Sequence, residues 1–186
     1  EIMKKNNFDN EKIILFPLSM RFFYIKNSPD RILLNTLFEG FKDNSNVKIL
    51  IRPHPGDKLD QNILENYFPG NNFIISNNTL FEDIFMSDAV IILPISSVGS
   101  EVPLFEKPLF LVNIDKDNST ITIDDAYLQL VEHDVAKLIT SSELVSTINS
   151  IDKDEIWKNS DSEKRKKFLE DYFNYGNYVD LLQLIE

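Results

Sequence analysis

The chain has 186 residues, which is enough for one domain with a packed core and too few for two domains of ordinary size. Its formal net charge of -11 at pH 7 would repel a polyphosphate, so nucleic acid is not an expected partner, and its lack of cysteine excludes disulfides, thiolate catalysis and zinc–thiolate sites. No apolar run approaches the ~20 residues of a membrane span, and the polar start of the chain lacks the apolar stretch of a signal peptide. We therefore expect a single cytoplasmic domain over residues 1–186 with no membrane span.

The first third of the sequence predicts a strand, a helix and a second strand. Residues 12–18 (KIILFPL) form a short apolar run of the kind that a buried parallel strand requires. Ser28 and Pro29 are typical of a helix start, because serine caps the first turn and proline fits the first helical position; apolar residues at helical spacing follow. The run 47–51 (VKILI) predicts the second strand, which the prolines and the glycine within 52–56 bring to an end.

The middle of the chain repeats this alternation. A short helix is predicted over 60–68, and a third strand follows over 72–76 (NFIIS). Thr79 and Glu82 have the spacing of a capping box, in which the hydroxyl and the carboxylate satisfy first-turn N–H groups, so a helix begins there and runs to about residue 87. Two further apolar runs predict the fourth and fifth strands: 89–93 (AVIIL) and 109–114 (LFLVNI).

The last third of the sequence gives weaker signals. We expect a polar loop over 115–125, a helical turn over 126–131 and a sixth strand over 135–139. A helix over 141–151 and further helices within 152–186 are expected to follow. Strands that alternate with helices predict a parallel sheet covered on both faces, because right-handed crossovers place helices there. The predicted fold class is therefore α/β. We expect a Rossmann-like, doubly wound parallel sheet of about five to six strands with helices on both faces and a C-terminal helical segment.

Polar side chains follow three of the predicted strands at the point where each strand ends. Ser19 and Arg21 follow the first strand, Arg52 and His54 follow the second, and the segment 96–101 (SSVGSE) follows the fourth. In an open parallel sheet, ligands bind outside the carboxyl ends of the strands. The sequence therefore predicts a binding site that these three segments share.

The segment after the fourth strand is the most informative of the three. Ser96 and Ser97 bring two hydroxyl groups to a predicted helix start, and Gly99 and Ser100 follow them. Unpaired first-turn N–H groups and the helix dipole would favour a phosphate there, and Pro103, which lacks an N–H, favours a cap near Ser100. Ordinary N-capping by serine is the alternative, and the two interpretations stay open on this segment alone.

Arg52 and His54 belong to the segment Arg-Pro-His-Pro, in which the prolines stiffen the loop. A guanidinium and an imidazolium at a strand end could neutralise a diphosphate or protonate a leaving phosphate. The alternative is a structural turn in which His54 is a solvated or capping group.

Glu101 lies one turn into the helix predicted after the serines, where its carboxylate could accept hydrogen bonds from the hydroxyls of a ribose. The alternative is a first-turn acid that the helix dipole stabilises. The two histidines of the chain are too few and too far apart in sequence to predict a metal site, and we expect no cofactor.

Three segments together resemble the C-terminal half of the GT-B glycosyltransferases: 49–55 (ILIRPHP), 80–92 (LFEDIFMSDAVII) and 96–108 (SSVGSEVPLFEKP). They are most similar to the bacterial capsule and surface-polysaccharide group with a His-Pro motif and a Ser-Ser motif. That group includes sialyltransferases, Kdo transferases and CDP-glycerol glycerophosphotransferases. The tail segment 168–173 (FLEDYF) is similar to the closing helix of such enzymes.

The resemblance implies a role for four of the candidate residues. His54 matches the His-Pro histidine, which contacts the donor phosphate or assists departure of the leaving group. Ser96 and Ser97 match the pair that binds phosphate, and Glu101 matches the carboxylate that holds the ribose. The chain would then be the donor-binding half of a two-domain transferase that uses a CMP-, CDP- or UDP-activated donor and a surface-polysaccharide acceptor.

The same resemblance implies that a second domain, which would precede residue 1, supplies the acceptor contacts and the catalytic base. We therefore expect the chain alone to be inactive. Two alternatives stay open. One is a non-catalytic nucleotide-binding or scaffolding module of the same fold. The other is a UDP-N-acetylglucosamine 2-epimerase-like domain, whose Glu-x-Pro and Lys-Pro elements match Glu101, Pro103 and 107–108, although epimerases carry glycines where Ser96 and Ser97 stand.

Overall fold

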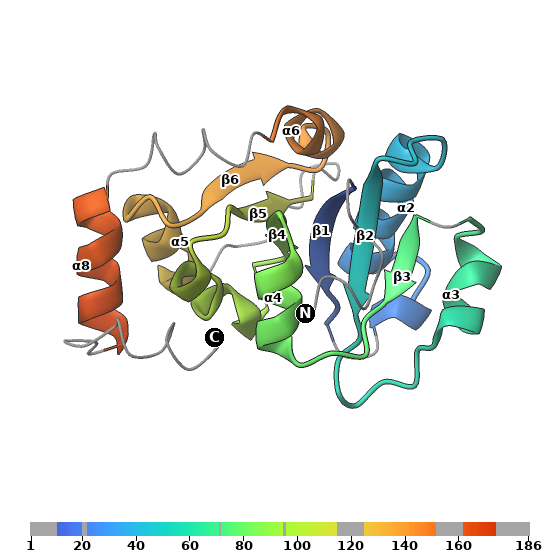
Figure 1. Ribbon diagram of the computed structural model, residues 1–186, viewed down its shortest axis with the longest axis horizontal. Coiled ribbons are helices and arrows are strands. Elements are labelled where there is room, and N and C mark those ends of the chain that lie inside the picture. Colours follow the sequence, from blue (N-terminus) through green and yellow to red (C-terminus); the bar gives the residue numbers. More distant parts are fainter. Residues whose placement is uncertain are drawn as a thin grey trace.

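The sheet of this protein has six parallel strands in the order β3-β2-β1-β4-β5-β6 (Figure 1). A computed structural model describes residues 11–19, 22–70, 72–94, 96–114, 125–151 and 162–173. The strands are β1 (Lys12–Pro17), β2 (Val47–Arg52), β3 (Phe73–Ile75), β4 (Ala89–Ile92), β5 (Leu109–Asn113) and β6 (Lys137–Thr140). This order confirms the predicted α/β, Rossmann-like doubly wound sheet. It also places β1 in the interior of the sheet, with β2 and β3 on one side of it and β4, β5 and β6 on the other.

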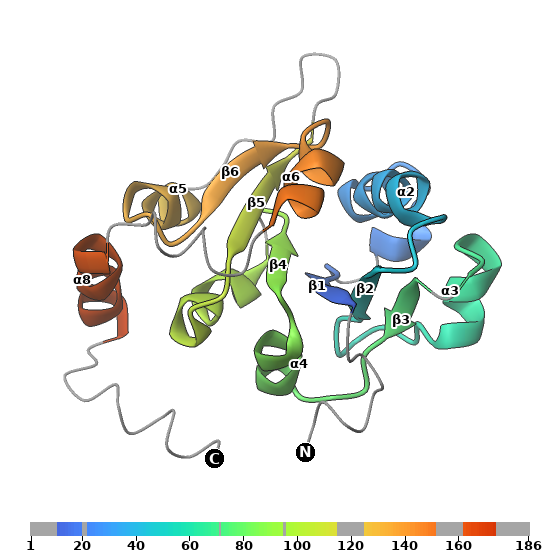
Figure 2. The ribbon, with the colours of Figure 1, turned by 45° about the horizontal axis from the view of Figure 1, so that its top comes forward.

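Helices cover both faces of the sheet, as Figures 1 and 2 show. The longer helices are α2 (Pro29–Phe41), α3 (Gln61–Tyr67), α4 (Leu80–Met86), α5 (Asp125–Glu132), α6 (Leu144–Ser150) and α8 (Ser162–Phe173). Short 3-10 helices are η1 (Phe22–Tyr24), η2 (Ser97–Ser100) and η3 (Val102–Phe105). Helices α2, α3 and α6 pack in the core on one face, and α4, η3, α5 and α8 pack in the core on the other.

The central strands are apolar on both sides because each side faces a helical layer. In β1, Ile14 and Phe16 belong to the core under α2 and α6, whereas Ile13 and Leu15 belong to the core under α4 and α8. All four side chains are buried. A half-exposed strand would alternate between apolar and polar residues, so the unbroken run KIILFP follows from burial on two faces.

The predicted helix starts are confirmed in detail. Ser28 caps α2, its hydroxyl accepting from the Arg31 N–H at 3.2 Å. Thr79 and Glu82 form the complete capping box at the start of α4. Each such cap satisfies N–H groups that the helix itself cannot pair, which is why these short local patterns were sufficient to predict the starts.

The structure differs from the prediction after β4. A regular helix was expected from 96–101 onward, but the chain forms the two 3-10 helices η2 and η3, which meet at Glu101. Pro103 lies in the first turn of η3, as expected, but the cap is Glu101 instead of Ser100. The predicted loop over 115–125 lies almost wholly outside the described residues. Every helix in the described ranges is too short or too polar to span a membrane.

Candidate functional site

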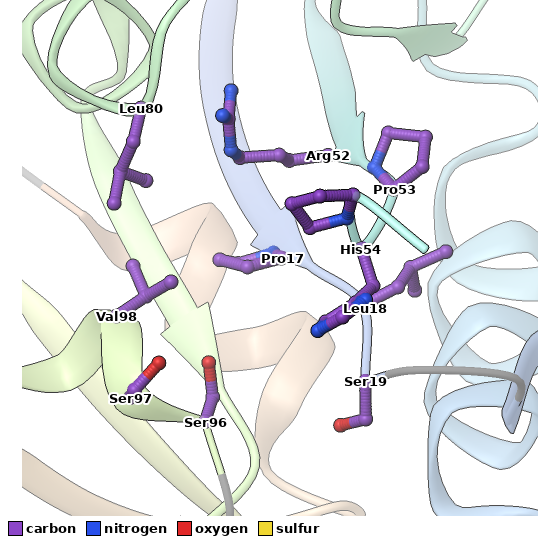
Figure 3. A pocket seen from close by; sticks show the side chains of 11 residues that line it. Pro17, Leu18, Ser19, Arg52, Pro53, His54, Leu80, Ser96, Ser97 and Val98 are labelled. Atoms are coloured by element: carbon purple, nitrogen blue, oxygen red, sulfur yellow. The ribbon is translucent and has the colours of Figure 1, made fainter. Parts of the chain in front are cut away.

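A pocket of about 730 Å³ opens at the carboxyl ends of β1, β2 and β4 (Figure 3). Its lining combines an apolar wall with hydroxyl, imidazole and guanidinium groups: Pro17, Leu18, Ser19, Arg52, Pro53, His54, Pro55, Leu80, Ser96, Ser97 and Val98. Strands β1 and β4 are neighbours in the sheet, but the chain forms β2 and β3 between them. The pocket therefore lies at the switch point of the sheet, where ligands of doubly wound folds bind.

The three strand ends that the sequence singled out meet in this pocket. Pro17 at the end of β1 pairs in register with Arg52 at the end of β2, and the Leu18 N–H donates to the Arg52 carbonyl at 2.9 Å. Ser96 and Ser97 enter from the end of β4. Arg21, which was considered with Ser19, lies outside the described residues. The sheet thus brings together side chains that are up to 78 positions apart, from Ser19 to Ser97.

Arg52 is directed to α4 and not to the middle of the pocket, as Figure 3 shows. Its Nη1 atom forms an ion pair with Asp83 Oδ2 at 2.7 Å and donates to the Asn78 carbonyl at 2.8 Å. Asp83 is fully buried, and it also accepts from the Ser76 hydroxyl at 2.6 Å. The charge of Arg52 is thus balanced by a carboxylate that could not be buried alone, and its expected contact with a phosphate stays a prediction.

His54 is held by the turn that follows β2. The Asp57 N–H donates to the His54 carbonyl at 2.8 Å, which closes a turn over 54–57, and the Gly56 N–H donates to His54 Nδ1 at 3.0 Å. Because Nδ1 accepts, the proton of the neutral ring is on Nε2. Figure 3 shows the ring between the two sides of the pocket, with Ser96 and Ser97 across from it. The turn therefore fixes the ring and leaves Nε2–H as a donor to a ligand.

Ser96 and Ser97 present hydroxyl groups that the local helix does not use. Ser96 is the residue before η2, yet its side chain makes no capping hydrogen bond. Figure 3 shows both hydroxyl groups directed into the pocket. The alternative of ordinary N-capping by serine is therefore not what the structure shows. The expected dipole of a regular helix is also absent, because η2 has only four residues. The Ser96 and Ser97 hydroxyls are therefore available as donors to an anion at this strand end.

Gly99, Ser100 and Glu101 lie beyond the pocket lining. Gly99 is buried against β4, where an added Cβ would come within 2.6 Å of Ile92 Cδ1. The Ser100 hydroxyl donates to the Ser97 carbonyl at 2.8 Å and lies 3.2 Å from Glu101 Oε2. Gly99 and Ser100 thus shape the segment that carries the serines. The ribose contact expected of Glu101 stays a prediction.

One residue near the site was not recognised from the sequence. Asp30, in the first turn of α2, is fully buried, and its Oδ1 atom accepts the Ser19 N–H at 2.7 Å. Burial raises the pKa of Asp30 to about 6, although hydrogen bonding from backbone N–H groups and from the Ser19 side chain lowers it in part. An acid in a first helical turn is usually explained by the helix dipole, so no local signal distinguished it.

The pocket can bind an anion that carries an apolar or flat group. Leu18, Leu80 and Val98 offer apolar contact area, while the serine hydroxyls and His54 Nε2–H are donors at the same cavity. Within the described ranges, no three or more side chains of His, Asp or Glu are grouped so that they could hold a metal ion. Phosphate esters of nucleosides combine a flat base with an anionic group, which is the combination that this lining offers.

Comparison with known proteins agrees with this chemistry. Residues 28–178 match the family described as CDP-glycerol:poly(glycerophosphate) glycerophosphotransferase. Among solved structures, the wall teichoic acid polymerase TagF is similar, with a TM-score of 0.61 and 19% identity over 98% of this chain and 44% of that one. No curated protein matches the chain significantly.

Two further structures share the fold. The S. aureus MnaA–UDP complex has a TM-score of 0.59 and 15% identity, covering 97% of this chain and 49% of its own. The UDP-GlcNAc 2-epimerase from Neisseria meningitidis bound to UDP-GlcNAc has a TM-score of 0.52 and 15% identity, covering 93% and 47%. The chain therefore spans less than half the length of these structures, and at such identities the likeness concerns the fold.

Proposed function

The chain belongs to the CDP-glycerol:poly(glycerophosphate) glycerophosphotransferase family, and from this premise we propose that it is the donor-binding domain of a transferase that uses a nucleotide-activated donor. The donor is a CDP-linked polyol, from which a polyol phosphate is transferred, and CMP- and UDP-linked sugars are the other candidates. The acceptor is a growing surface polymer. The reaction takes place in the cytoplasm, which is consistent with a chain that has no cysteine.

The single observation that supports this proposal most is the meeting of three strand ends in one pocket. Ser19, His54 and the pair Ser96 and Ser97 follow β1, β2 and β4 in turn, and all four residues line the cavity. A site for a diphosphate needs several donors on different sides of the anion. The switch point of the sheet is where such donors can converge on one ligand.

In the proposed reaction an acceptor hydroxyl attacks the β-phosphorus of the CDP-linked donor. A P–O bond to the acceptor forms, the P–O bond to CMP breaks, and the acceptor proton passes to a base. Negative charge grows on the phosphate of the leaving CMP. His54 Nε2–H and the Ser96 and Ser97 hydroxyls stabilise this charge by hydrogen bonds, so they contribute to the rate as well as to binding.

Arg52 and Glu101 have different roles in this proposal. Arg52 positions the wall of the pocket, because its ion pair with Asp83 fastens the end of β2 to α4. Glu101, which is half-buried at the junction of η2 and η3, accepts the ribose hydroxyls. A donor that enters between β1 and β4 would then place its phosphates at the serines and its ribose further along the same segment.

The base and the acceptor contacts come from a second, facing domain. This part of the proposal rests on the resemblance to the two-domain GT-B enzymes and on the chain spanning less than half of the structures that it matches. A pocket at the carboxyl edge supplies donors to the phosphate but offers no described carboxylate for deprotonating an acceptor. The 186-residue chain alone should therefore bind the donor without transferring its group.

A thermal-shift panel of CMP, CDP, UMP, UDP and GDP tests the proposal. CDP at 100 times its Kd should raise the free energy of unfolding by ~2.7 kcal/mol, because it binds the folded state only. A family that uses CDP-glycerol predicts that the cytidine nucleotides raise Tm most. A panel in which no nucleotide raises Tm would overturn the proposed function, and a larger effect of UDP would assign a different base.

A further inference from the structure

A carboxyl group and a hydroxyl group behind the pocket wall are buried without complete hydrogen bonding. Asp30 is fully buried, and its Oδ1 accepts the Ser19 N–H at 2.7 Å. Its Oδ2 and the Ser19 hydroxyl oxygen are both buried and make no hydrogen bond of ordinary geometry with a described residue, although the Ser19 side chain lies close enough to Asp30 to lower its pKa in part. Native proteins leave few buried polar atoms unsatisfied, so two on residues that contact each other point to a function.

The position of Ser19 connects this pair to the pocket. Ser19 is part of the lining, so a turn of its side chain about χ1 moves the hydroxyl between Asp30 and the cavity. The hydroxyl has one hydrogen to donate, whereas a carboxylate and a phosphate can only accept. A phosphate at Ser19 and an ionised Asp30 would therefore compete for one hydrogen, and the two anions would repel each other.

We propose that Asp30 responds to the donor phosphate through Ser19: when the phosphate binds, Asp30 takes up a proton from solvent and donates it in a hydrogen bond to Ser19 Oγ, while Ser19 turns its own hydrogen to the phosphate. No covalent bond of Ser19 changes. Asp30 is a positioning residue in this scheme, and the inference rests on the proposed function. Asp30 Oδ2, the Ser19 hydroxyl and the bound phosphate then each have a hydrogen-bond partner.

The charged groups around Asp30 favour this proton uptake. Asp57, from the loop between β2 and α3, adds negative charge nearby and acts to keep Asp30 protonated. Arg31, the next residue in α2, is directed to an aromatic group, with its guanidinium carbon 4.2 Å from the centre of the Tyr67 ring. It forms no ion pair with Asp30 in the described part of the chain. His54 lines the pocket on the neighbouring strand end and will face the same phosphate.

The proton can be taken up near neutral pH. Burial raises the pKa of Asp30 to about 6, so the carboxyl group of the free protein is mostly ionised at pH 7 and mostly protonated at pH 5. A phosphate next to Ser19 adds a negative charge and raises the pKa further. Uptake should therefore be large at pH 7 and small at pH 5.

Calorimetry with CDP in buffers of different ionisation enthalpy measures this uptake. The 186-residue chain and its Asp30→Asn variant are titrated at pH 5, 6, 7 and 8. The wild type should take up about 0.8 proton more than the variant at pH 7 and close to none more at pH 5. Protonation changes of CDP itself and of every group other than residue 30 are common to both proteins, so the difference isolates Asp30.

The affinity gives a second signature. Asparagine keeps an oxygen for the Ser19 N–H and offers a permanent N–H to Ser19 Oγ, so it imitates the protonated acid. The affinity of Asp30→Asn for CDP, divided by that of the wild type, should be about 10-fold larger above pH 7 than at pH 5. Asp30→Ala, which loses both contacts, should bind less tightly at every pH. If Asp30 had only a structural role, the affinity of Asp30→Asn relative to the wild type would not change with pH.

The outcomes separate this inference from the proposed function. If CDP binds with the same proton uptake and the same pH profile in the wild type and Asp30→Asn, the inference is wrong and the proposed function stands. If neither CDP nor inorganic pyrophosphate binds at any pH, both are wrong. Should the variants fail to fold, difference infrared spectra of the wild type with pyrophosphate decide: the band of a protonated carboxyl group must appear on binding, and its absence overturns the inference.

Discussion

Two buried carboxylates lie in helices on opposite faces of the sheet, and their surroundings differ. Asp83 in α4 accepts from Ser76 and forms an ion pair with Arg52, so its charge is balanced inside the fold. Asp30 in α2 accepts the Ser19 N–H at Oδ1, and its Oδ2 makes no hydrogen bond of ordinary geometry with a described residue. Both side chains are fully buried. The comparison separates polar groups that complete the fold from polar groups that are available to a ligand.

The same difference extends to the strand ends. The end of β2 carries Arg52, whose Nη1 has two partners, and mutation of Arg52 should affect mainly stability. The end of β4 carries Ser96 and Ser97, whose hydroxyls face the cavity, and mutation there should affect mainly binding. Four variants test this division, from the largest expected effect on stability to the smallest.

Arg52→Ala should lower the free energy of unfolding by about 3 to 5 kcal/mol, because Asp83 would keep a buried charge without its partner. Urea denaturation measures the change. The matched control is Glu39→Ala, which breaks the ion pair of Glu39 with Lys42, also 2.7 Å long but exposed to solvent. That variant should change stability by less than about 0.5 kcal/mol. Equal effects of the two variants would contradict the structural role of Arg52.

Asp30→Asn should stabilise the protein relative to the wild type, in contrast to Arg52→Ala, and the size of this effect should depend on pH. Because the pKa of Asp30 rises from 3.8 to about 6 on folding, the folded state binds more protons than the unfolded state between these values. The wild type therefore loses stability as pH rises from 4 to 7, and the asparagine variant lacks this loss. The stability of the variant relative to the wild type should increase by about 2.4 kcal/mol over that range. Parallel curves from denaturation at pH 4, 5, 6 and 7 would show that Asp30 ionises freely.

The double variant Ser96→Ala and Ser97→Ala should lower stability by no more than about 1 kcal/mol, since neither hydroxyl serves as a cap. Hydrogen bonds to a charged ligand contribute about 1.5 to 3 kcal/mol each, so the affinity for CDP should fall at least tenfold. Calorimetry measures both proteins. Ser150→Ala is the matched control, because Ser150 is an exposed serine at the end of α6, outside the pocket lining. Unchanged affinity in the double variant would remove the phosphate site from this strand end.

His54→Ala should change stability least, by less than about 0.5 kcal/mol, because the lost hydrogen bond to Gly56 is exposed. Binding of CDP should nevertheless weaken, and turnover in a complete transferase should fall by ~10²–10⁴ if His54 acts on the leaving phosphate. His54→Asn is the control: its side-chain oxygen can accept the Gly56 N–H, but it lacks Nε2. A loss of affinity in both variants would assign the effect to Nε2, whereas normal binding in His54→Asn would show that His54 serves the turn alone.

Most of the sheet could be predicted from the sequence because its signals are local. After Lys12, the run IILFP is apolar at every position since both of its faces are covered, and the capping box of Thr79 and Glu82 lies within four residues. The meeting of three strand ends could also be predicted from the sequence, because the carboxyl ends of parallel strands lie at the same edge of the sheet. These inferences required no contact between distant side chains.

The features that could not be predicted depend on distant pairs. Arg52 and Asp83 are 31 positions apart, and both had a plausible local explanation, as a strand-end cation and as a first-turn acid. Asp30 likewise had the helix dipole as a sufficient reason, and only the fold shows that it accepts the Ser19 N–H. The break between η2 and η3 at Glu101 has no sequence signal that we can identify.

The central place of β1 also affects how the protein is made on the ribosome. The Ile13 N–H donates to Asp88, 75 positions further along, so one edge of β1 has no strand beside it until β4 has been synthesised. At ~5–20 residues per second this takes about 4 to 15 s. An unpaired apolar edge can bind other unfinished chains during that time. A nascent chain that stalls before β4 would expose this edge, so it is the intermediate most in need of a chaperone.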